Sequence, residues 1–447
     1  MLQNYNNRQT WPIIYTTIIC AISLVIASPL FFILAFFPLI LLRREWVVPM
    51  LLLPSLIGGA INTEESIIPL GILSVMFLSP VLLIDSLKYN NKIQWKYSRY
   101  FYLFALFVVL GFVVHNFRFG FDTTIIQETV TNLIRLSFFL LLFKFLINKR
   151  KEYLKQSLLC LVYSVIPIIL CVVLYAFTIG KELKMANSAE IMLFGGAKHG
   201  EFTGILTAFS ICVFYWGRKK GNNLYRLIFA ILVLVAAFYL ILNMGSKNGL
   251  LSFALMIIGG LFFFIQSQSN IKKVLIFIFG ILAILISMSF YSEEILNSPT
   301  IERLDTQYEK RGVEGVSTSR LDVWRAGFKA MQDAPLLGWG GSGEKIALVS
   351  VKYGGPRNVM HNTFMQVWVR YGSLALILFI SFIWLLYKRG KNIYQYCKVN
   401  GDYIWFIPVF SFFMLLFSGM FISWFWQTLL WYNAVFILAI TTKLKYH

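Results

Sequence analysis

Apolar segments recur along almost the whole chain. They run for roughly 15 to 25 residues with few charges and are separated mostly by short polar connections. A helix needs about 20 apolar residues to cross a bilayer, and in lipid its backbone hydrogen bonds must be satisfied internally. Because 58% of the 447 residues are hydrophobic and only 13% are charged, a soluble protein is excluded. The sequence therefore predicts an all-α fold, a polytopic integral membrane helical bundle.

The hydropathy pattern predicts about 12 to 14 transmembrane helices. The first apolar stretch, residues 11–42, is too long for a cleavable signal peptide and is interpreted as two short spans. The candidate spans are residues 11–27, 29–42, 46–61, 67–86, 100–115, 125–147, 157–179, 203–217, 226–243, 248–266, 273–291, 363–387, 403–419 and 421–440.

The basic residues predict the orientation of these spans. The net charge is +20, but most Lys and Arg lie in short connections, where membrane orientation explains them better than nucleic acid does. If the N-terminus is cytoplasmic, the basic connections fall on the cytoplasmic side, and both termini are then cytoplasmic. These connections are residues 43–44, 88–99, 149–155, 218–226, 272–273, 388–398 and the tail with Lys443 and Lys445.

One outer connection is much longer than a turn between two helices requires. It divides the chain into an N-terminal helical bundle (1–291), a large periplasmic loop (292–362) and C-terminal transmembrane helices (363–447). Within the loop, apolar residues at helical spacing predict a surface helix over residues 319–332 that lies on or near the outer membrane surface. Its predicted apolar residues are Leu321, Trp324, Phe328 and Met331.

Histidines lie at the predicted outer ends of spans. His115, His199 and His361 have this position, and imidazole is the side chain most easily poised as a base near neutral pH. A single interfacial His is more often structural than functional. His361 differs because it opens the motif His361-Asn362, with Gly372 ten residues after the Asn, where the chain re-enters the membrane.

A polar face is also predicted inside one span. Glu128, Asn132 and Arg135 follow at helical spacing, and Arg135 would lie close to the middle of the bilayer. Charged residues at that depth form structural ion pairs or line substrate paths, and the sequence leaves both roles open.

Three motifs together resemble one family. They are Ser319-Arg320-Leu321-Asp322-Val323-Trp324, Pro335-Leu336-Leu337-Gly338-Trp339-Gly340, and His361-Asn362 with Gly372. Their order in a large loop followed by a helix resembles the O-antigen ligase and polymerase superfamily of bacterial envelope glycan assembly. The resemblance is strongest over residues 317–375.

The resemblance implies a multi-pass protein of the bacterial inner membrane and an inverting glycosyl transfer without a metal or another cofactor. The donor would be an undecaprenyl diphosphate-linked glycan, and the acceptor would be lipid A-core for a ligase or another lipid-linked glycan for a polymerase. A lipid-linked oligosaccharide transporter is the remoter alternative, but no internal repeat is apparent. Membrane lipids are the further expected partners, and nucleic acid is not one.

This chemistry needs a base for the acceptor hydroxyl and cations for the departing diphosphate. The resemblance implies His361 as the base and Arg320 as the catalytic cation. Lys247 stands in an element where the family commonly has Arg, and it is a candidate for diphosphate binding. The further candidates for diphosphate binding are Lys198, Arg325 and Arg357, and the supporting residues are Asn362, Gly372, Arg135 and His199.

Overall fold

A computed structural model shows how part of the chain folds. Its residues form two compact units, one from 1–71 and 157–310 and the other from 72–156 and 311–447. The described residues are 18, 60–62, 67–88, 93–159, a few isolated positions between 250 and 309, 320–420, 425–426 and 428–444. The remaining predicted spans lie outside these residues, so the total helix count and the three-part division stay predictions.

A small antiparallel β-ribbon is present in the first unit. Strand β1 (Ala60–Asn62) pairs with β2 (Ile67–Pro69), and Ile61 lies opposite Ile68. Helix α4 (Leu70–Lys88) follows directly and corresponds to the predicted span 67–86. The hydropathy pattern did not predict the ribbon, because strands of three residues are too short to give a period.

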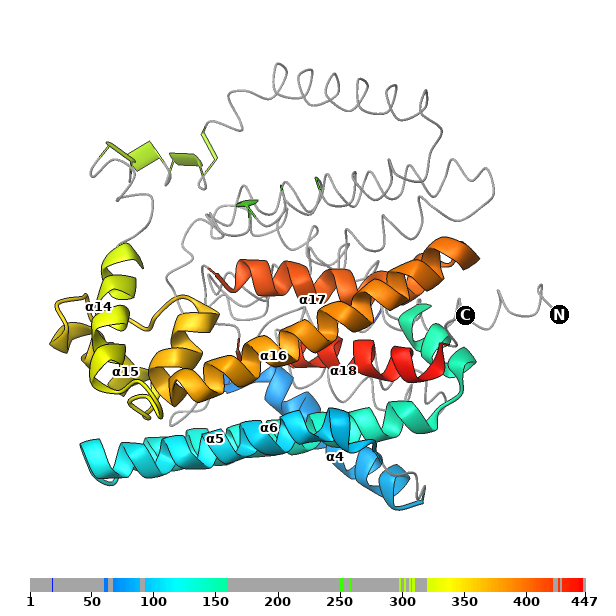
Figure 1. Ribbon diagram of the computed structural model, residues 1–447, viewed down its shortest axis with the longest axis horizontal. Helices are drawn as coiled ribbons and strands as arrows, with labels where there is room; N and C mark the ends of the chain where they lie inside the picture. Colours follow the sequence, from blue (N-terminus) through cyan, green and yellow to red (C-terminus); the bar gives the residue numbers. More distant parts are fainter. Residues whose placement is uncertain are drawn as a thin grey trace. The chain divides into compact units, whose positions relative to one another are not determined.

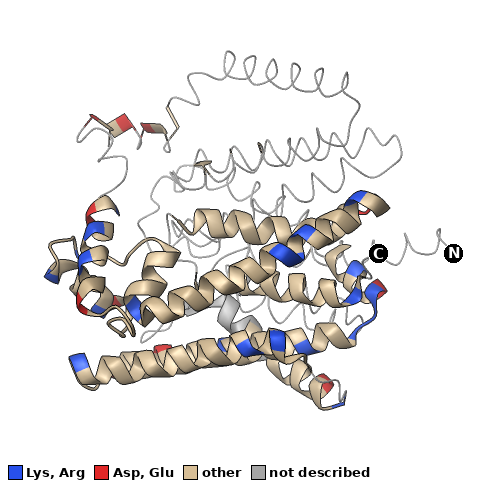
Figure 2. Cartoon of the chain, in the orientation of Figure 1, with Lys and Arg blue, Asp and Glu red and all other residues tan. Residues whose placement is uncertain are grey.

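Long apolar helices dominate the second unit (Figure 1). Among the described residues, three helices are long and apolar enough to cross a membrane: α5 (Trp95–Phe119), α6 (Thr123–Asn148) and α16 (Thr363–Asn400). Charged residues lie mainly toward the ends of these helices, with long uncharged stretches between them (Figure 2). The predicted all-α membrane fold is therefore confirmed.

Aromatic side chains hold this bundle together. Trp431 on α18 (Thr428–Lys443) lies between Phe382 of α16 and Phe139 of α6, with ring centroids 5.6 and 6.1 Å away. Phe104 of α5 joins them through edge contacts at 5.3 Å to Trp431 and 5.9 Å to Phe382. Because such pairs add to the burial of large apolar surface, these four rings fix α5, α6, α16 and α18 against one another.

Three predicted helix boundaries are wrong. The basic segment 388–398 was predicted as a connection, but α16 continues through it to Asn400 and ends at Gly401, whose φ of 67° is left-handed. Lys, Arg and Gln are good helix formers, so a helix leaving the bilayer need not stop where hydropathy falls. The predicted span 403–419 is a 3₁₀ turn (Tyr403–Phe406) followed by α17 (Ile407–Ser418), and α18 begins seven residues later than the predicted start at 421.

The segment at residues 320–362, part of the predicted outer loop, contains two helices that pack together, and the first of them also packs against α16 (Figure 1). The predicted helix at 319–332 is confirmed as α14 (Arg320–Asp333), whereas α15 (Gly343–Lys352) was not predicted. Of the apolar residues predicted for α14, Met331 is buried, whereas Leu321 and Phe328 are 36% and 54% exposed. Small residues pack instead, since a Cβ on Gly327 would lie 3.0 Å from the sulfur of Met360. The buried residues of α14 are Val323, Ala326, Gly327, Ala330 and Met331.

Candidate functional site

Helix α16 is broken at Gly372. The backbone there has φ 84° and ψ 178°, which separates a short segment, 363–371, from the long segment that follows. This conformation is essentially confined to glycine. A Cβ on Gly372 would also lie 2.0 Å from the carbonyl oxygen of Leu336. The glycine of the third motif is therefore required by the backbone and by the loop that packs against it.

The second motif docks onto this break. The N–H groups of Trp339 and Gly340 donate to the carbonyls of Val369 and Arg370, at 2.8 and 2.9 Å. The N–H of Ser373 donates in turn to the carbonyl of Pro335, at 2.8 Å. These bonds satisfy backbone groups that the break in α16 would leave without partners. The second and third sequence motifs thus form one interlock.

The same loop also contacts α5. Gly340 has φ 66°, and a Cβ on it would lie 2.5 Å from the carbonyl oxygen of Gly111. Trp339 is buried, and its indole N–H donates to the carbonyl of Ala330 at 2.8 Å. The loop is therefore inserted between α5, α14 and α16, which fixes the segment at residues 320–362 on the bundle.

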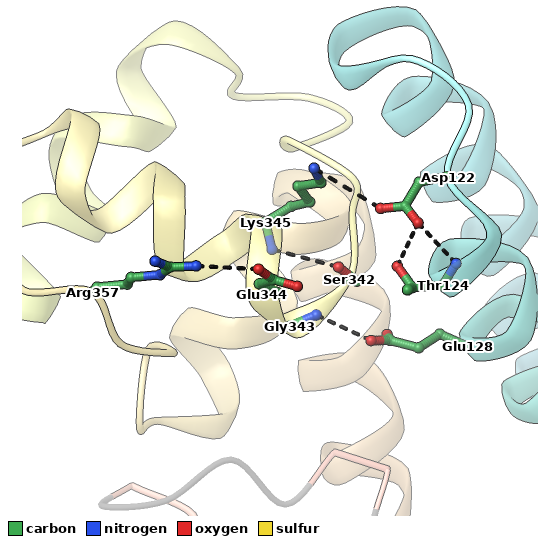
Figure 3. Close-up of polar contacts among 8 residues, drawn as sticks. All are labelled: Asp122, Thr124, Glu128, Ser342, Gly343, Glu344, Lys345 and Arg357. Carbon is green, nitrogen blue, oxygen red and sulfur yellow. Dashed lines mark hydrogen bonds and ion pairs between the residues drawn. The ribbon is translucent and has the colours of Figure 1, made fainter. Parts of the chain in front are cut away.

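A charged cluster completes this connection (Figure 3). Glu128 on α6 accepts a hydrogen bond from the N–H of Gly343 at 3.1 Å and forms an ion pair with Arg370. A carboxylate at the first residue of α15 also suits the positive end of the helix dipole. Glu128 therefore joins α6, α15 and the short segment of α16. The sequence left open an ion pair between Glu128 and Arg135, but the ion-pair partner of Glu128 is Arg370.

Asp122 supports the cluster from the start of α6 (Figure 3). Its carboxylate accepts from the N–H and the hydroxyl of Thr124, at 2.9 and 2.8 Å, and lies 3.9 Å from the Nζ of Lys345. The two bonds from Thr124 hold the pKa of Asp122 below its usual value. Asp122 is therefore ionised at neutral pH and caps α6 while it faces the cation on α15.

The His361-Asn362 motif is fixed on both sides. Before it, the carbonyl of Met360 accepts from the indole of Trp324 at 2.9 Å, and the N–H of Met360 donates to Gln366 at 3.3 Å. After it, the side chain of Asn362 accepts from the N–H of Met365 at 3.0 Å and so caps α16. His361 itself has φ 45°, a left-handed conformation that is uncommon outside glycine. The backbone at His361 is thus fixed from both sides.

The hydrogen bonds of His361 assign its proton. Its Nε2 lies 2.9 Å from the Oδ1 of Asn358, which also accepts from the N–H of Val359 at 3.0 Å. Because a backbone N–H can only donate, Oδ1 is an acceptor, and Nε2 must carry the proton. The lone pair of the neutral ring is then on Nδ1.

The surroundings favour the neutral ring. Burial lowers the pKa of His361, and the positive charge of Arg320 lowers it further. The structure therefore brings Arg320, the first residue of α14, close enough to His361 for their charges to interact. A base with this environment is deprotonated at neutral pH and can accept a proton.

The other candidate cations differ in position. Arg325 pairs with Asp322 at 3.0 Å, with side chains 64% and 52% exposed, and Arg357 pairs with Glu344 at 3.1 Å in a similarly exposed position. Such surface pairs contribute little to stability and leave both cations accessible. Arg135 lies deeper and donates from Nη1 to the carbonyl of Trp426 at 3.3 Å. Lys198, His199 and Lys247 lie outside the described residues.

Several residues at the site were not predicted. Asn358 and Trp426 belong to no recognisable pattern in the sequence, and only the folded chain places them beside His361 and Arg135. Trp339 was part of a motif, but its role as the buried centre of the docked loop was not apparent. The guanidinium of Arg118 and the ammonium of Lys352 lie 4.4 and 4.6 Å from its ring centroid.

The fold and the site together define a helical membrane protein with the segment at residues 320–362 locked onto its bundle. Residues 232–380 match a family model described as O-antigen ligase. This match supports the O-antigen ligase and polymerase superfamily, which the three motifs predict from the sequence. The match also supports a lipid-linked glycan transferase as the general class of this membrane protein.

A relative without a described activity also matches. A protein of Haemophilus influenzae described as "Uncharacterized protein" is 23% identical over 317 residues, which cover 66% of this chain and 71% of that protein. The similarity therefore extends beyond the matched family segment, but the name of this relative adds nothing about its substrate.

Proposed function

We propose that the protein catalyses an inverting, metal-independent transfer of an undecaprenyl diphosphate-linked glycan to a sugar hydroxyl. The reaction would take place on the periplasmic side of the bacterial inner membrane, with both termini of the chain in the cytoplasm. The observation that carries the proposal is the position of His361, which directly precedes the membrane helix α16 and has its Nε2 2.9 Å from the Oδ1 of Asn358.

In this proposal His361 acts as a general base. Nδ1 takes the proton of the acceptor hydroxyl as that oxygen attacks the anomeric carbon of the donor sugar. The bond from this carbon to the diphosphate oxygen breaks on the opposite side, and the diphosphate leaves with the electron pair. Arg320 stabilises the negative charge that develops. Lys198, Lys247, Arg325 and Arg357 remain candidates for further contacts to the diphosphate, and His199 remains a candidate supporting residue.

We infer a ligase, with lipid A-core as the acceptor, and the alternative is a polymerase that adds lipid-linked repeats. A deletion strain tests this choice through its lipopolysaccharide, separated by size. A ligase is indicated if all long glycan is lost from the core. A single repeat on the core would instead indicate a polymerase, and an unchanged ladder would contradict both functions.

The guanidinium of Arg320 provides a test of diphosphate binding. We expect Arg320→Lys to lower the rate of transfer about tenfold although it keeps the charge, because an ammonium cannot form the paired hydrogen bonds of a guanidinium. The measurement is the initial rate of the purified protein. The matched control is Arg150→Lys, an exposed position just beyond the inner end of α6. Equal rates for Arg320→Lys and wild type would show that Arg320 supplies no more than charge.

A further inference from the structure

The amide of Asn358 is a hydrogen-bond partner of the His361 ring. Its Oδ1 lies 2.9 Å from Nε2 of the ring and also accepts from the N–H of Val359 at 3.0 Å. This second bond fixes which end of the amide faces the ring, because a backbone N–H cannot donate to an NH₂ group. If the proton were on Nδ1, the lone pair of Nε2 would point at an oxygen that offers only lone pairs. The contact therefore selects the neutral ring that has its proton on Nε2.

The segment that carries this hydrogen bond is held by the surrounding fold. Met360 lies between the two residues, and its carbonyl accepts from the indole N–H of Trp324 at 2.9 Å. Its N–H donates to the side chain of Gln366 at 3.3 Å, and both of these residues are buried. The segment is thus anchored to α14 and to α16. On this fixed backbone the imidazole of His361 cannot turn without losing its bond to Asn358.

Asn358 supplies its hydrogen bond without a charge. A carboxylate in the same place would stabilise the protonated ring and raise its pKa, as opposite charges within about 4–6 Å do. Of the charged side chains around the ring in the described part of the chain, Arg320 on α14 is the one that acts on it, and it lowers the pKa of His361. A neutral acceptor therefore suits a base that must be unprotonated at neutral pH.

We propose that Asn358 is a positioning residue for the transfer reaction, whose amide oxygen keeps the proton of His361 on Nε2 and leaves the lone pair of Nδ1 for the acceptor hydroxyl. This role rests on the proposed function of His361 as a general base. When Nδ1 takes the hydroxyl proton, the proton on Nε2 stays in place and its bond to Asn358 becomes charge-assisted. Asn358 thus also stabilises the imidazolium, which later loses the proton on Nδ1 to water.

The first test places a charge beside Nε2. Asn358→Asp keeps the oxygen that accepts from His361 and Val359, so we expect it to retain most of the transfer rate at pH 8. The acid limb of its kcat/KM should move to higher pH by about one unit, because the carboxylate stabilises the protonated ring. The matched control is Asn400→Asp, which adds the same charge at the exposed far end of α16 and should leave the limb unchanged.

The second test removes the acceptor. We expect the kcat of Asn358→Ala to fall about tenfold while KM changes little, because the ring is then free to adopt other orientations and the other tautomer. Thermal unfolding of each variant is measured alongside. Asn358→Asp should unfold like wild type, so that a shifted acid limb in this variant reports on the ring and not on a damaged fold.

The tautomer of His361 can also be observed without any transfer. The chain has four His, so nitrogen NMR of protein with isotope-labelled imidazoles gives few signals, and His361→Ala identifies those of His361. We expect the neutral wild-type ring to carry its proton on Nε2, and Asn358→Ala to contain a larger share of the other tautomer. A wild-type ring with its proton on Nδ1, or identical tautomer populations in the two proteins, would overturn the proposal.

The outcomes separate the role of Asn358 from the proposed function. An acid limb of Asn358→Asp that coincides with that of wild type, or an unchanged kcat of Asn358→Ala, overturns the positioning role. If His361→Ala is inactive in the same experiments, the base stands and the role of Asn358 fails alone. If His361→Ala transfers glycan at the wild-type rate, the base is assigned wrongly and the positioning role fails with it.

Discussion

His361→Ala is expected to transfer glycan at least about a hundredfold more slowly than the wild-type protein, while it is expressed and inserted normally. A positioned general base contributes about this factor, equivalent to about 2.7 kcal/mol of activation free energy. The fold should survive because the contacts on either side of His361 use the backbone of Met360 and the side chain of Asn362. The measurement is the initial rate of purified protein with a lipid-linked donor and an acceptor.

A second histidine serves as the control for this variant. His447 is the last residue of the chain, and His447→Ala should have wild-type activity. The amount of each protein in the membrane and its thermal transition should be compared as well. We predict a normal thermal transition together with a low rate of transfer. An inactive His361→Ala protein that has lost its thermal transition would therefore contradict the prediction.

Gly372→Ala is expected to destabilise the protein by at least about 3 kcal/mol. The alanine would be strained at φ 84° and ψ 178°, and its Cβ would collide with the carbonyl of Leu336, 2.0 Å away. Relief of that collision would separate the loop at Pro335–Gly340 from α16 and break its three backbone hydrogen bonds. The measurement is the thermal unfolding temperature in detergent, together with the fraction of monodisperse protein.

Gly120 provides a matched control for Gly372. It has nearly the same backbone conformation, with φ 81° and ψ 179°, but a Cβ there would meet nothing within 4 Å. Gly120→Ala therefore measures the backbone strain alone, which is about 1 to 3 kcal/mol. Equal destabilisation by the two substitutions would show that the interlock between the loop and α16 adds nothing.

The membrane helices were predictable because lipid leaves the backbone few alternatives. The spans over α5 and α6 follow from apolar length alone, and the helix at α14 follows from its spacing. The packing face of α14 was not predictable in the same way. Close approach to Met360 selects small residues such as Gly327, which a search for large apolar side chains overlooks.

The candidate site was predictable in its motifs but not in its contacts. His361 and Arg320 were identified through the resemblance, and the structure places their charges close enough to interact. The pair of Glu128 with Arg370 joins residues 242 positions apart, so helical spacing could not reveal it. Spacing along α6 favoured Arg135 as the partner, whereas the fold brings Trp426 to Arg135.

The pH dependence of kcat/KM, measured with chelator present, tests most directly whether His361 is the base. Burial and Arg320 lower the pKa of His361, so the active neutral form should persist to below the ordinary value of about 6.5. We predict that kcat/KM rises with pH through one acid limb below that value and is flat to about pH 8. The limb should be absent from the residual activity of His361→Ala. A limb that persists in His361→Ala, or activity that falls as the pH rises through this range, would contradict the account.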